Sequence, residues 1–302
     1  MGPTASGKTE LAVRLVENLP LAIISVDSAM VYRGMDIGTA KPEAAILRRA
    51  PHRLIDIREP EDTYSAGDFV RDAQAEMANI RAAGRVPLLV GGTMMYFRAL
   101  TRGIAELPAA DAQLRRGIDR EARAEGWPAL HARLAEVDPA AAARIAPNDS
   151  QRIQRALEVW RASGRPLSAW LADEQSRTPA PCYLRIGLVP EPRASLHRRI
   201  ETRFRHMLEA GFVDEVIRLQ QRPALAAGSP AMRAVGYRQI WSYLDGRSTL
   251  DEAYRNAVTA TRQLAKRQMT WLRTEDGLTC HNPLEEDVFG AISARIRERL
   301  EL

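Results

Sequence analysis

The first nine residues constrain the fold more than any other part of the sequence. Gly2, Gly7, Lys8 and Thr9 complete the pattern G-x-x-x-x-G-K-[ST], a loop whose backbone N–H groups and lysine surround a phosphate group. Such a loop joins a parallel strand to the first turn of a helix, where the helix dipole favours an anion. The pattern predicts an α/β protein with a phosphate site at Gly2, Thr4, Ala5, Ser6, Gly7, Lys8 and Thr9.

A loop of this kind needs a strand in front of it, and only Met1 precedes it here. We expect that several residues precede Met1 in the natural protein and supply this strand. The alternative is that the natural chain starts at Met1 and that another segment takes the position of the strand.

Short apolar runs that end in polar or glycine residues alternate with helical patterns in this sequence. Continuous apolar strands separated by helices are typical of a parallel sheet with helices on both faces. We therefore predict an α/β fold with a P-loop-type parallel sheet flanked by helices. The expected strands are residues 21–27, 52–57, 86–92 and 183–190, and the expected helices of the first hundred residues include 9–18 and 66–83.

Residues 101–181 differ from their surroundings, because they are rich in alanine and arginine and contain no strand-like run. Proline after acidic residues and glycine after apolar positions mark several helix starts and stops in this segment. We predict an all-helical insertion domain at 101–181 and a catalytic core formed by residues 1–100 and 182–302. From residue 193 to the end, the core is predicted to be mostly helical.

The composition is that of a globular protein, with 45% hydrophobic and 27% charged residues. No apolar run reaches the roughly 18 residues of a membrane-spanning helix, so no membrane partner is expected. A secretory signal peptide is not expected, because the phosphate loop occupies the N-terminus. Cys182 and Cys280 lack a C-x-x-C spacing, which predicts two reduced thiols in a cytoplasmic protein.

Positive charge is concentrated in the last third of the sequence. Residues 182–302 carry 19 Lys and Arg against 15 Asp and Glu, whereas residues 1–181 carry 24 against 23. On a helix over 255–273, one side collects four basic residues, and no acidic residue interrupts the segment. A basic ridge on a packed helix suits a polyanion such as a nucleic acid. The ridge consists of Arg255, Arg262, Lys266 and Arg273.

The default ligand of a phosphate loop is a nucleotide, as in an ATP-binding kinase or NTPase. Such proteins carry a further carboxylate for Mg²⁺ at the end of an apolar strand. The run at 86–92 ends in two glycines instead, so the kinase pattern is incomplete. Asp27 closes the run at 21–27 and lies where ligands of open α/β sheets bind. The alternative is that Asp27 caps a helix or forms a turn.

Five ordered motifs together resemble the tRNA dimethylallyltransferases, which are also called tRNA isopentenyltransferases (the IPP transferase family). The motifs are GPTASGKT, SVDSAMVYRGMDIGTAKP, VGGTMMYFRAL, SGRPLS and MRAVGYRQ. The resemblance runs from Gly2 to about Arg273, which is nearly the whole chain. Met30 and Met94 stand where many members have Gln and Gly, which can alter the fit of the substrate without removing the chemistry.

The resemblance implies a prenyltransferase in which the loop holds dimethylallyl diphosphate rather than a nucleotide. The implied acceptor is the exocyclic amine of adenosine 37 in tRNAs reading codons that start with U, and the products are N6-dimethylallyladenosine and diphosphate. Asp27 matches the catalytic aspartate, because a carboxylate can take the proton of the amine as the C–N bond forms. Thr9 is implied to hold Mg²⁺, the cofactor. Arg233 matches an arginine near the diphosphate, and Lys41 could add a further positive charge.

The resemblance also implies contacts with the tRNA anticodon stem-loop from the core and from the insertion domain, which would contact the anticodon arm. A monomer is expected. The matching positions for tRNA binding are Asp27, Ser28, Ala29, Met30, Thr93, Arg115, Gln151, Arg152, Ile153, Gln154, Arg155, Gln263, Lys266, Arg267 and Gln268.

Two other hypotheses stay open from the sequence alone. Dimethylallyl transfer to free adenine nucleotides would use the same loop and aspartate, but it would need neither a large insertion nor a basic ridge. A P-loop kinase, or a nucleotide-gated RNA-binding protein, would bind ATP. The missing further carboxylate for Mg²⁺ counts against this last hypothesis.

Overall fold

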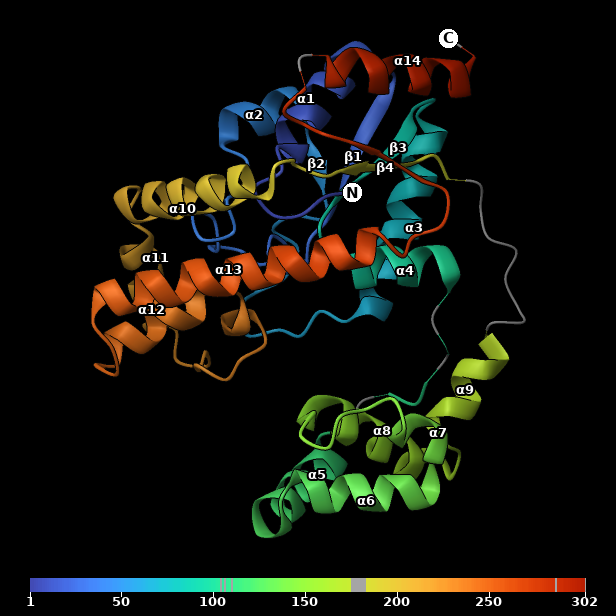
Figure 1. The fold of residues 1–302 in the computed structure, drawn as a ribbon, viewed down its shortest axis with the longest axis vertical. Coiled ribbons are helices and arrows are strands. Elements are labelled where there is room, and N and C mark those ends of the chain that lie inside the picture. The colour runs from blue at the N-terminus through green and yellow to red at the C-terminus, as the bar shows by residue number, and fades with distance from the viewer. Residues whose placement is uncertain (104, 106, 110, 175–182, 286, 302) are drawn as a thin grey trace. The chain divides into compact units, whose positions relative to one another are not determined.

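The computed structural model describes residues 1–103, 105, 107–109, 111–174, 183–285 and 287–301. The chain forms two compact units, one of Met1–Leu100 with Cys182–Leu302 and the other of Thr101–Pro181. Each unit has a hydrophobic core of its own. In Figure 1 the first unit runs from blue to teal and again from yellow to red, and the second unit is green.

The first unit contains two parallel sheets. In the three-stranded sheet β1 lies between β2 and β3, and in the other sheet β4 pairs with β5. All three long apolar runs of the N-terminal part contribute a strand, as the pattern predicts. The strands are β1 (Leu21–Val26), β2 (His52–Arg53), β3 (Val86–Gly91), β4 (Arg185–Leu188) and β5 (Leu278–His281).

Helices surround these sheets and make up most of the remaining chain of this unit. The helices are α1 (Lys8–Asn18), α2 (Ala44–Arg49), α3 (Ala66–Ala82), α4 (Met94–Arg102), α10 (Arg193–Glu209), α11 (Phe212–Gln220), the 3₁₀ turn η1 (Ala231–Arg233), α12 (Tyr237–Leu244), α13 (Leu250–Leu272) and α14 (Val288–Leu300).

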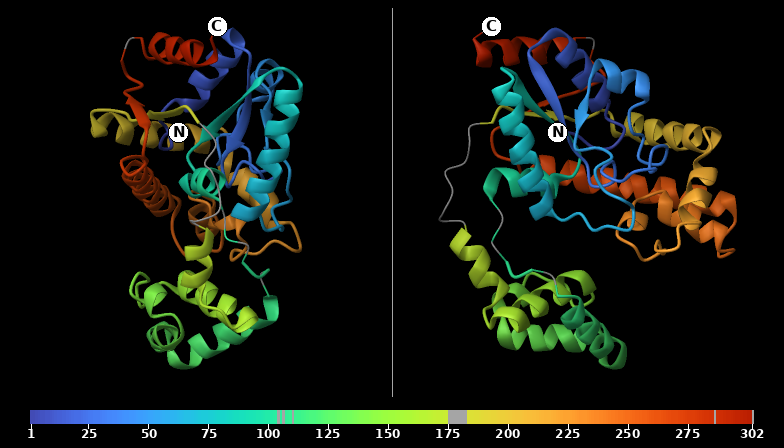
Figure 2. Two further views of the ribbon diagram at one scale, coloured as in Figure 1. Left: turned by 90° about the vertical axis from the view of Figure 1, so that its right-hand side faces the viewer. Right: turned by 180° about the vertical axis from the view of Figure 1, so that it is seen from behind.

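Side chains alternate along β1, and helices cover both faces of its sheet (Figure 2). Ile23 belongs to a buried cluster with Val13 of α1. Ile24, one residue further on, belongs to the main core together with Phe69 of α3. Alternation along a strand sends successive side chains to opposite faces, so the predicted α/β sheet with helices on both faces is confirmed.

The residue in front of the phosphate loop is paired with β4. The Met1 ammonium donates to the carbonyl oxygen of Ile186 (2.7 Å), and the Leu188 N–H donates to the carbonyl oxygen of Met1 (2.8 Å). This is the bonding pattern of a parallel strand. The edge of β4 therefore fixes the point from which the phosphate loop starts.

Two strands differ from the prediction. β2 ends at Arg53 rather than at residue 57, because Leu54 and Asp56 have φ angles of 62° and 55°, which take the backbone out of the extended region. The strand β5 was not predicted. Its residues are half-buried or exposed, so they carry no continuous apolar run that a sequence pattern could detect.

The long helix α13 packs against α10 and α12. It begins with a capping box, in which the Thr249 hydroxyl accepts from the Glu252 N–H (3.2 Å) and the Glu252 carboxylate accepts from the Thr249 N–H (2.8 Å). Ala257, Ala265 and Leu272 form its buried side. One face of α13 is thereby buried in the core, and the opposite face is free to carry charged side chains.

The described residues of the second unit form helices joined by loops and turns, as predicted for the insertion. Asp149 caps α8 by accepting from the Arg152 N–H (3.2 Å), and Gly164 ends the helix with a φ of 68°. Its core gathers Ile118, Leu130 and Leu157. The helices are α5 (Ala112–Glu125), α6 (Trp127–Val137), α7 (Pro139–Ala142), α8 (Ser150–Ser163) and α9 (Leu167–Glu174).

The composition led to expectations about membrane-spanning helices and about the two cysteines. In the part of the chain that the structure describes, no helix combines the length and the apolar character needed to cross a membrane. Cys280 is an exposed free thiol. Cys182, also predicted to be a reduced thiol, lies outside the described residues.

We expect that Gly91→Ala disrupts the sheet. A Cβ atom at Gly91 would collide with the carbonyl oxygen of Val26, and overpacking of a core typically costs roughly 1–3 kcal/mol. Urea unfolding should show this loss of stability. Gly228→Ala is the control, because a Cβ there meets open space and should change stability by less than about 0.5 kcal/mol. Equal stability of the two variants would contradict the packing argument.

Candidate active site

The phosphate loop is held in the conformation that an anion site requires. Gly7 caps α1 with a φ of 88°, and Ala5 has a φ of 62°, so successive backbone N–H groups turn toward one space. A Cβ at Gly2 would lie 2.7 Å from Oγ of Ser6 and 3.1 Å from the carbonyl oxygen of Leu188, so a larger residue there would displace Ser6 or press against β4. The loop therefore presents the N-terminus of α1 to a pocket.

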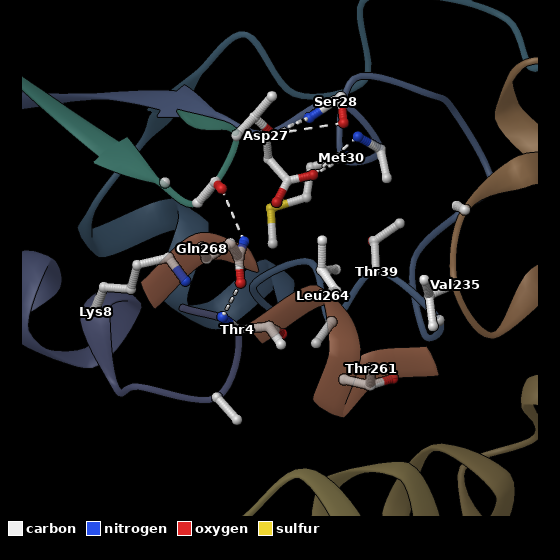
Figure 3. A pocket seen from close by; sticks show the side chains of 18 of the residues that line it. Thr4, Lys8, Asp27, Ser28, Met30, Thr39, Val235, Thr261, Leu264 and Gln268 are labelled. Carbon is white, nitrogen blue, oxygen red and sulfur yellow. Dashed lines mark hydrogen bonds between the residues drawn. The ribbon is translucent and has the colours of Figure 1, made fainter. Parts of the chain in front are cut away.

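Lys8 extends from the first turn of α1 into this pocket (Figure 3). Its ammonium donates to the carbonyl oxygen of Pro3 (2.9 Å). Burial lowers the pKa of Lys8 to about 8, the charge of Arg203 adds to the shift, and the charge of Asp27 opposes it. The ammonium is therefore desolvated, and an anionic ligand would stabilise its charged form.

Asp27 follows the last residue of β1, and its carboxylate points into the same pocket (Figure 3). One carboxylate oxygen accepts from the Ala29 N–H (2.8 Å) and from the Met30 N–H (3.2 Å). Asp27 therefore forms the turn that was the alternative to a catalytic role. The turn also fixes the direction of the carboxylate, and the catalytic role of Asp27 stays a prediction.

Gln268 of α13 has a role that the sequence does not reveal. Its side-chain oxygen accepts from the Thr4 N–H (2.9 Å), and its side-chain nitrogen donates to the carbonyl oxygen of Gly92 (2.8 Å). The residue is 9% exposed. Both ends of the amide thus hold the phosphate loop against the end of β3. The contact of Gln268 with tRNA stays a prediction.

The pocket has a volume of about 520 Å³, and all of its lining residues belong to the first unit. Such a volume lies within the range of small-molecule sites. Its charged lining consists of cations around one carboxylate, Asp27, and its remaining wall includes apolar residues such as Val235 and Leu264 (Figure 3). The cationic side chains that line the pocket are Lys8, Arg203, Arg233 and Arg267.

Arg203 of α10 is a pocket residue that the motifs did not single out. Its guanidinium donates to the carbonyl oxygen of Thr39 (3.2 Å). Burial lowers the pKa of Arg203, and the charge of Asp27 opposes this shift. Arg199, one turn earlier, places its guanidinium near Gly7. The spacing of four residues on one helix face was the available sequence signal for this pair.

The two further cations predicted near the diphosphate have different surroundings. Arg233 of η1 lines the pocket, and its Nε donates to the carbonyl oxygen of Gly228 (3.2 Å). Lys41 is 5% exposed in its side chain and forms ion pairs with Asp36 (2.5 Å) and Asp56 (2.6 Å). The prediction that Lys41 adds charge to the phosphate site is therefore wrong, because two carboxylates already neutralise it.

Several residues predicted to contact tRNA lie together at the rim of the pocket. Ser28, Ala29, Met30 and Thr93 line it, and the Thr93 hydroxyl accepts from the Ser28 N–H (3.1 Å). This bond joins the ends of β1 and β3. The parallel arrangement of the two strands brings these predicted positions to one edge of the sheet.

The predicted basic ridge on α13 is only partly free. Arg255 pairs with Asp251, and Arg262 pairs with Glu201 of α10 (3.1 Å), so acidic residues outside 255–273 neutralise half of the ridge. Lys266 and Arg273 are exposed and form no ion pair with another residue that the structure describes. Gln263, Lys266 and Arg267 line a shallow hollow beside Trp271, where the predicted RNA contacts remain accessible.

Five predicted RNA contacts, residues 151–155, lie on α8 in the second unit. Ile153 is fully buried, so the side-chain contact predicted for it is wrong; it belongs to the helical core. Gln151 and Arg152 are exposed. Gln154 donates to Asp119 (2.7 Å) and keeps only part of its surface for a ligand.

The buried carboxylate of Glu158 holds two of the predicted arginines. Arg115 donates to both of its oxygens (2.9 and 3.1 Å), and Arg155 donates to one of them (2.7 Å). Their side chains stay 43% and 30% exposed. The two guanidinium groups therefore share one anchor, and each retains an exposed portion for an anion.

A metal ion in this pocket would depend on its substrate for ligands. Among the residues that the structure describes, no three His, Cys, Asp or Glu side chains are grouped as a metal site. Thr9 lines the pocket at the start of α1. A hydroxyl at a phosphate loop fits Mg²⁺, which readily takes its other ligands from phosphate oxygens and water.

The fold and the pocket define a phosphate-loop α/β protein with a helical insertion. A family model described as IPP transferase matches residues 30–275. A tRNA dimethylallyltransferase of Thiobacillus denitrificans is 59% identical over 300 residues, which are 99% of this chain and 96% of the relative. Another, of Alkalilimnicola ehrlichii, is 60% identical over 282 residues, covering 92% of this chain and 88% of the relative.

A solved structure gives the same result at lower identity. The full-length tRNA isopentenylpyrophosphate transferase of Bacillus halodurans has a TM-score of 0.72 and 37% identity, covering 99% of this chain and 95% of that chain. The chain belongs to the IPP transferase family. The resemblance inferred from the five sequence motifs is thereby confirmed.

We expect the affinity for inorganic diphosphate to fall as the pH rises through about 8, where Lys8 loses its proton in the empty pocket. Inorganic diphosphate loses its last proton in the same pH range, so the fall is defined relative to the control Lys8→Arg, in which the ligand titrates identically. Calorimetric titration from pH 7 to 9.5 at constant ionic strength measures the Kd. In the control Lys8→Arg, the guanidinium keeps its charge, so its Kd should report only the ionisation of the ligand. A wild-type curve parallel to that of the control would contradict the role of Lys8.

Proposed function

We propose that this chain transfers the dimethylallyl group from dimethylallyl diphosphate to the exocyclic amine of adenosine 37 in tRNAs that read codons starting with U. Diphosphate is the other product. One observation carries the proposal: the phosphate loop, four cationic side chains and Asp27 face one pocket of about 520 Å³. The names of the similar proteins, tRNA dimethylallyltransferases, suggest the transferred group and the acceptor.

The loop side of the pocket suits a departing diphosphate. The N-terminus of α1, the Lys8 ammonium and the Arg203 guanidinium are donors held in place by backbone contacts. Donors that are already aimed at developing negative charge lower the barrier, because they need not reorganise during the reaction. Arg233 adds a further positive charge to the lining of the pocket.

Mg²⁺ is the proposed cofactor, with the Thr9 hydroxyl as its protein ligand. When bound, the ion supplies positive charge that stabilises the leaving diphosphate. The pocket fits such an ion, because its described lining offers Thr9 and one carboxylate while the diphosphate brings oxygen ligands of its own.

Asp27 is the proposed general base. The allylic C–O bond breaks with its electron pair going to diphosphate, the exocyclic nitrogen forms the new C–N bond, and a proton of the amine passes to the carboxylate. The turn at Ala29 and Met30 holds one oxygen of Asp27, so the carboxylate meets the amine in a fixed orientation. Positioned proton acceptors of this kind typically contribute about 10²–10⁴-fold to the rate.

The apolar part of the pocket suits the five-carbon prenyl group. Val235 and Leu264 lie opposite Lys8 across the pocket, and Thr39 lies beside them (Figure 3). A prenyl chain held there would have its diphosphate at the loop and its allylic carbon within the space that Asp27 faces. By excluding water, this wall would protect the reacting allylic carbon, which gains positive charge, from hydrolysis.

RNA binding is proposed for basic side chains of both units. Lys266 and Arg267 are exposed beside the pocket, and Arg152 is exposed on α8. A base inside a folded loop must be turned out before its amine can enter a pocket, and phosphate contacts can hold the loop during this step. With a tRNA as substrate, the proposed place of the reaction is the cytoplasm, and a monomer suffices because one chain supplies the whole pocket.

The test offers labelled dimethylallyl diphosphate and Mg²⁺ with an anticodon stem-loop that carries an A-A-A run at positions 36–38. AMP and ATP are offered in parallel reactions. Label on the stem-loop alone is the expected result. Label on AMP or ATP would instead favour transfer to free adenine nucleotides, and ATP hydrolysis without transfer would favour a kinase-like activity.

Asp27→Asn should lower kcat about 10²–10⁴-fold while the Kd for the stem-loop changes less than about twofold. The asparagine oxygen can still accept from the Ala29 and Met30 N–H groups, so the turn survives and only the proton acceptor is lost. Single-turnover kinetics and a binding titration measure the two quantities. Turnover that stays near the wild-type value would remove Asp27 as the base.

Lys266→Ala should reduce the salt dependence of stem-loop binding, because one phosphate contact releases about one counterion. The slope of log K against log salt should become smaller by roughly 0.7–0.9. Arg255→Ala is the matched control on the same helix, since Arg255 is already paired with Asp251. If the two variants have the same slope as the wild type, this part of α13 does not contact RNA.

A further inference from the structure

Glu215 of α11 is a buried carboxylate that the proposed mechanism does not use. It is 2% exposed, and it forms no ion pair within the described residues. It accepts instead from the backbone N–H groups of Asp36 (2.9 Å), Ile37 (2.7 Å) and Gly38 (3.1 Å) and from the Tyr237 hydroxyl (2.5 Å). A buried carboxylate without an ion-pair partner is tolerated only when such hydrogen bonds satisfy it. Glu215 therefore holds the backbone of residues 36–38 in place.

The segment that Glu215 holds continues directly into the wall of the pocket. Gly38, Thr39 and Ala40 line the pocket. A Cβ at Gly38 would collide with the rings of Phe212 and Tyr237, so the backbone here is pressed against α11 and α12. Glu215 therefore fixes the position of this segment and the direction of the backbone carbonyl groups within it.

One of these carbonyl groups holds a cation of the pocket. The Thr39 carbonyl oxygen accepts from the Arg203 guanidinium (3.2 Å), and Arg203 lines the pocket with Lys8. A long arginine side chain has many rotamers, and holding it in one of them has an entropic cost that a fixed partner reduces. The position of Thr39 therefore sets the position of the Arg203 guanidinium.

We infer that Glu215 is a positioning residue for the diphosphate group of the substrate: through the backbone of residues 36–39 it fixes the Thr39 carbonyl and, with it, Arg203. This inference rests on the proposed function, because it requires a diphosphate in the pocket. Glu215 touches neither the diphosphate nor the reacting carbon. Its effect is transmitted by three backbone hydrogen bonds and one carbonyl.

The chemistry of the site requires a carboxylate rather than an amide. Three N–H donors and one O–H donor converge on Glu215, and an ionised carboxylate offers about four acceptor positions and no donor. Glutamine has nearly the same shape, but its NH₂ group would face a donor. Glu215→Gln therefore removes at least one hydrogen bond from the segment while leaving the volume of the core unchanged.

The experiment measures the Kd of inorganic diphosphate with Mg²⁺ by calorimetry, beside kcat and KM for transfer. Glu215→Gln should weaken diphosphate binding about tenfold or more, while the Kd for the anticodon stem-loop changes less than about twofold. Leu219→Ala, in the same helix and also buried, is the control for lost stability. It should lower the Tm without changing the Kd of diphosphate. An unchanged Kd in Glu215→Gln would overturn the inference.

A double-mutant cycle tests the route through Arg203. Arg203→Ala should weaken diphosphate binding by itself, and Glu215→Gln should then add less than about twofold, because the group that it positions is gone. Full additivity of the two effects would overturn the inference. If Glu215→Gln does not fold, Glu215→Asp carries the same test, since the shorter carboxylate cannot reach all three backbone donors.

Diphosphate binding separates this inference from the proposed function. If the wild type binds diphosphate but transfers no prenyl group, the proposed function fails, and the affinities of the variants still judge the role of Glu215. If the wild type transfers the group and the variants bind diphosphate normally, only the inference fails. If the wild type does not bind diphosphate at all, both are overturned.

Discussion

The pocket depends on one side-chain amide, that of Gln268. It joins the Thr4 N–H of the phosphate loop to the Gly92 carbonyl after β3, and it comes from a helix that lies far away in the sequence. A Cβ at Gly92 would lie 2.5 Å from the nitrogen of this amide, so the close approach requires a glycine. Losing a buried hydrogen-bonding partner typically costs about 1–3 kcal/mol. Two hydrogen bonds of the Gln268 amide therefore hold the phosphate loop, the end of β3 and α13 in one arrangement.

Backbone carbonyl groups hold the two cations that lie deepest among the charged groups of the pocket. Pro3 receives the Lys8 ammonium, and Thr39 receives the Arg203 guanidinium. Each carbonyl provides only a partial negative charge, which does not fully replace lost water, and so burial still lowers the pKa of both side chains. Both cations are thus placed before a ligand arrives and gain electrostatic stabilisation when an anion enters. Their positions are settled by folding rather than by binding, which is the condition for preorganised charge stabilisation.

The features that could be predicted from the sequence are those that short local patterns determine. The start of α1 at the phosphate loop and the strand β1, predicted over 21–27 and observed over Leu21–Val26, follow from such short patterns. The early end of β2 depends on positive φ angles at Leu54 and Asp56, and a leucine gives no signal for such an angle. Gln268, Arg203 and Glu215 act through contacts between segments more than 150 residues apart, and no spacing rule detects such pairs. Ile153 matches a family position for tRNA contact, although its helical position places it in the core.

The buried cluster of the helical insertion contains only residues of that unit, among them Ile118, Leu134 and Leu157. A substitution there alters packing in the insertion without requiring any compensating change around the sheet, since energetic coupling between sites is strong mainly for residues in contact. The buried clusters of the two units can therefore accumulate substitutions independently. Over evolutionary time, the surface offered by the insertion can diversify while the residues around the phosphate loop stay under selection for one chemistry. The insertion can thus change in sequence while the catalytic core keeps the same residues around the phosphate loop.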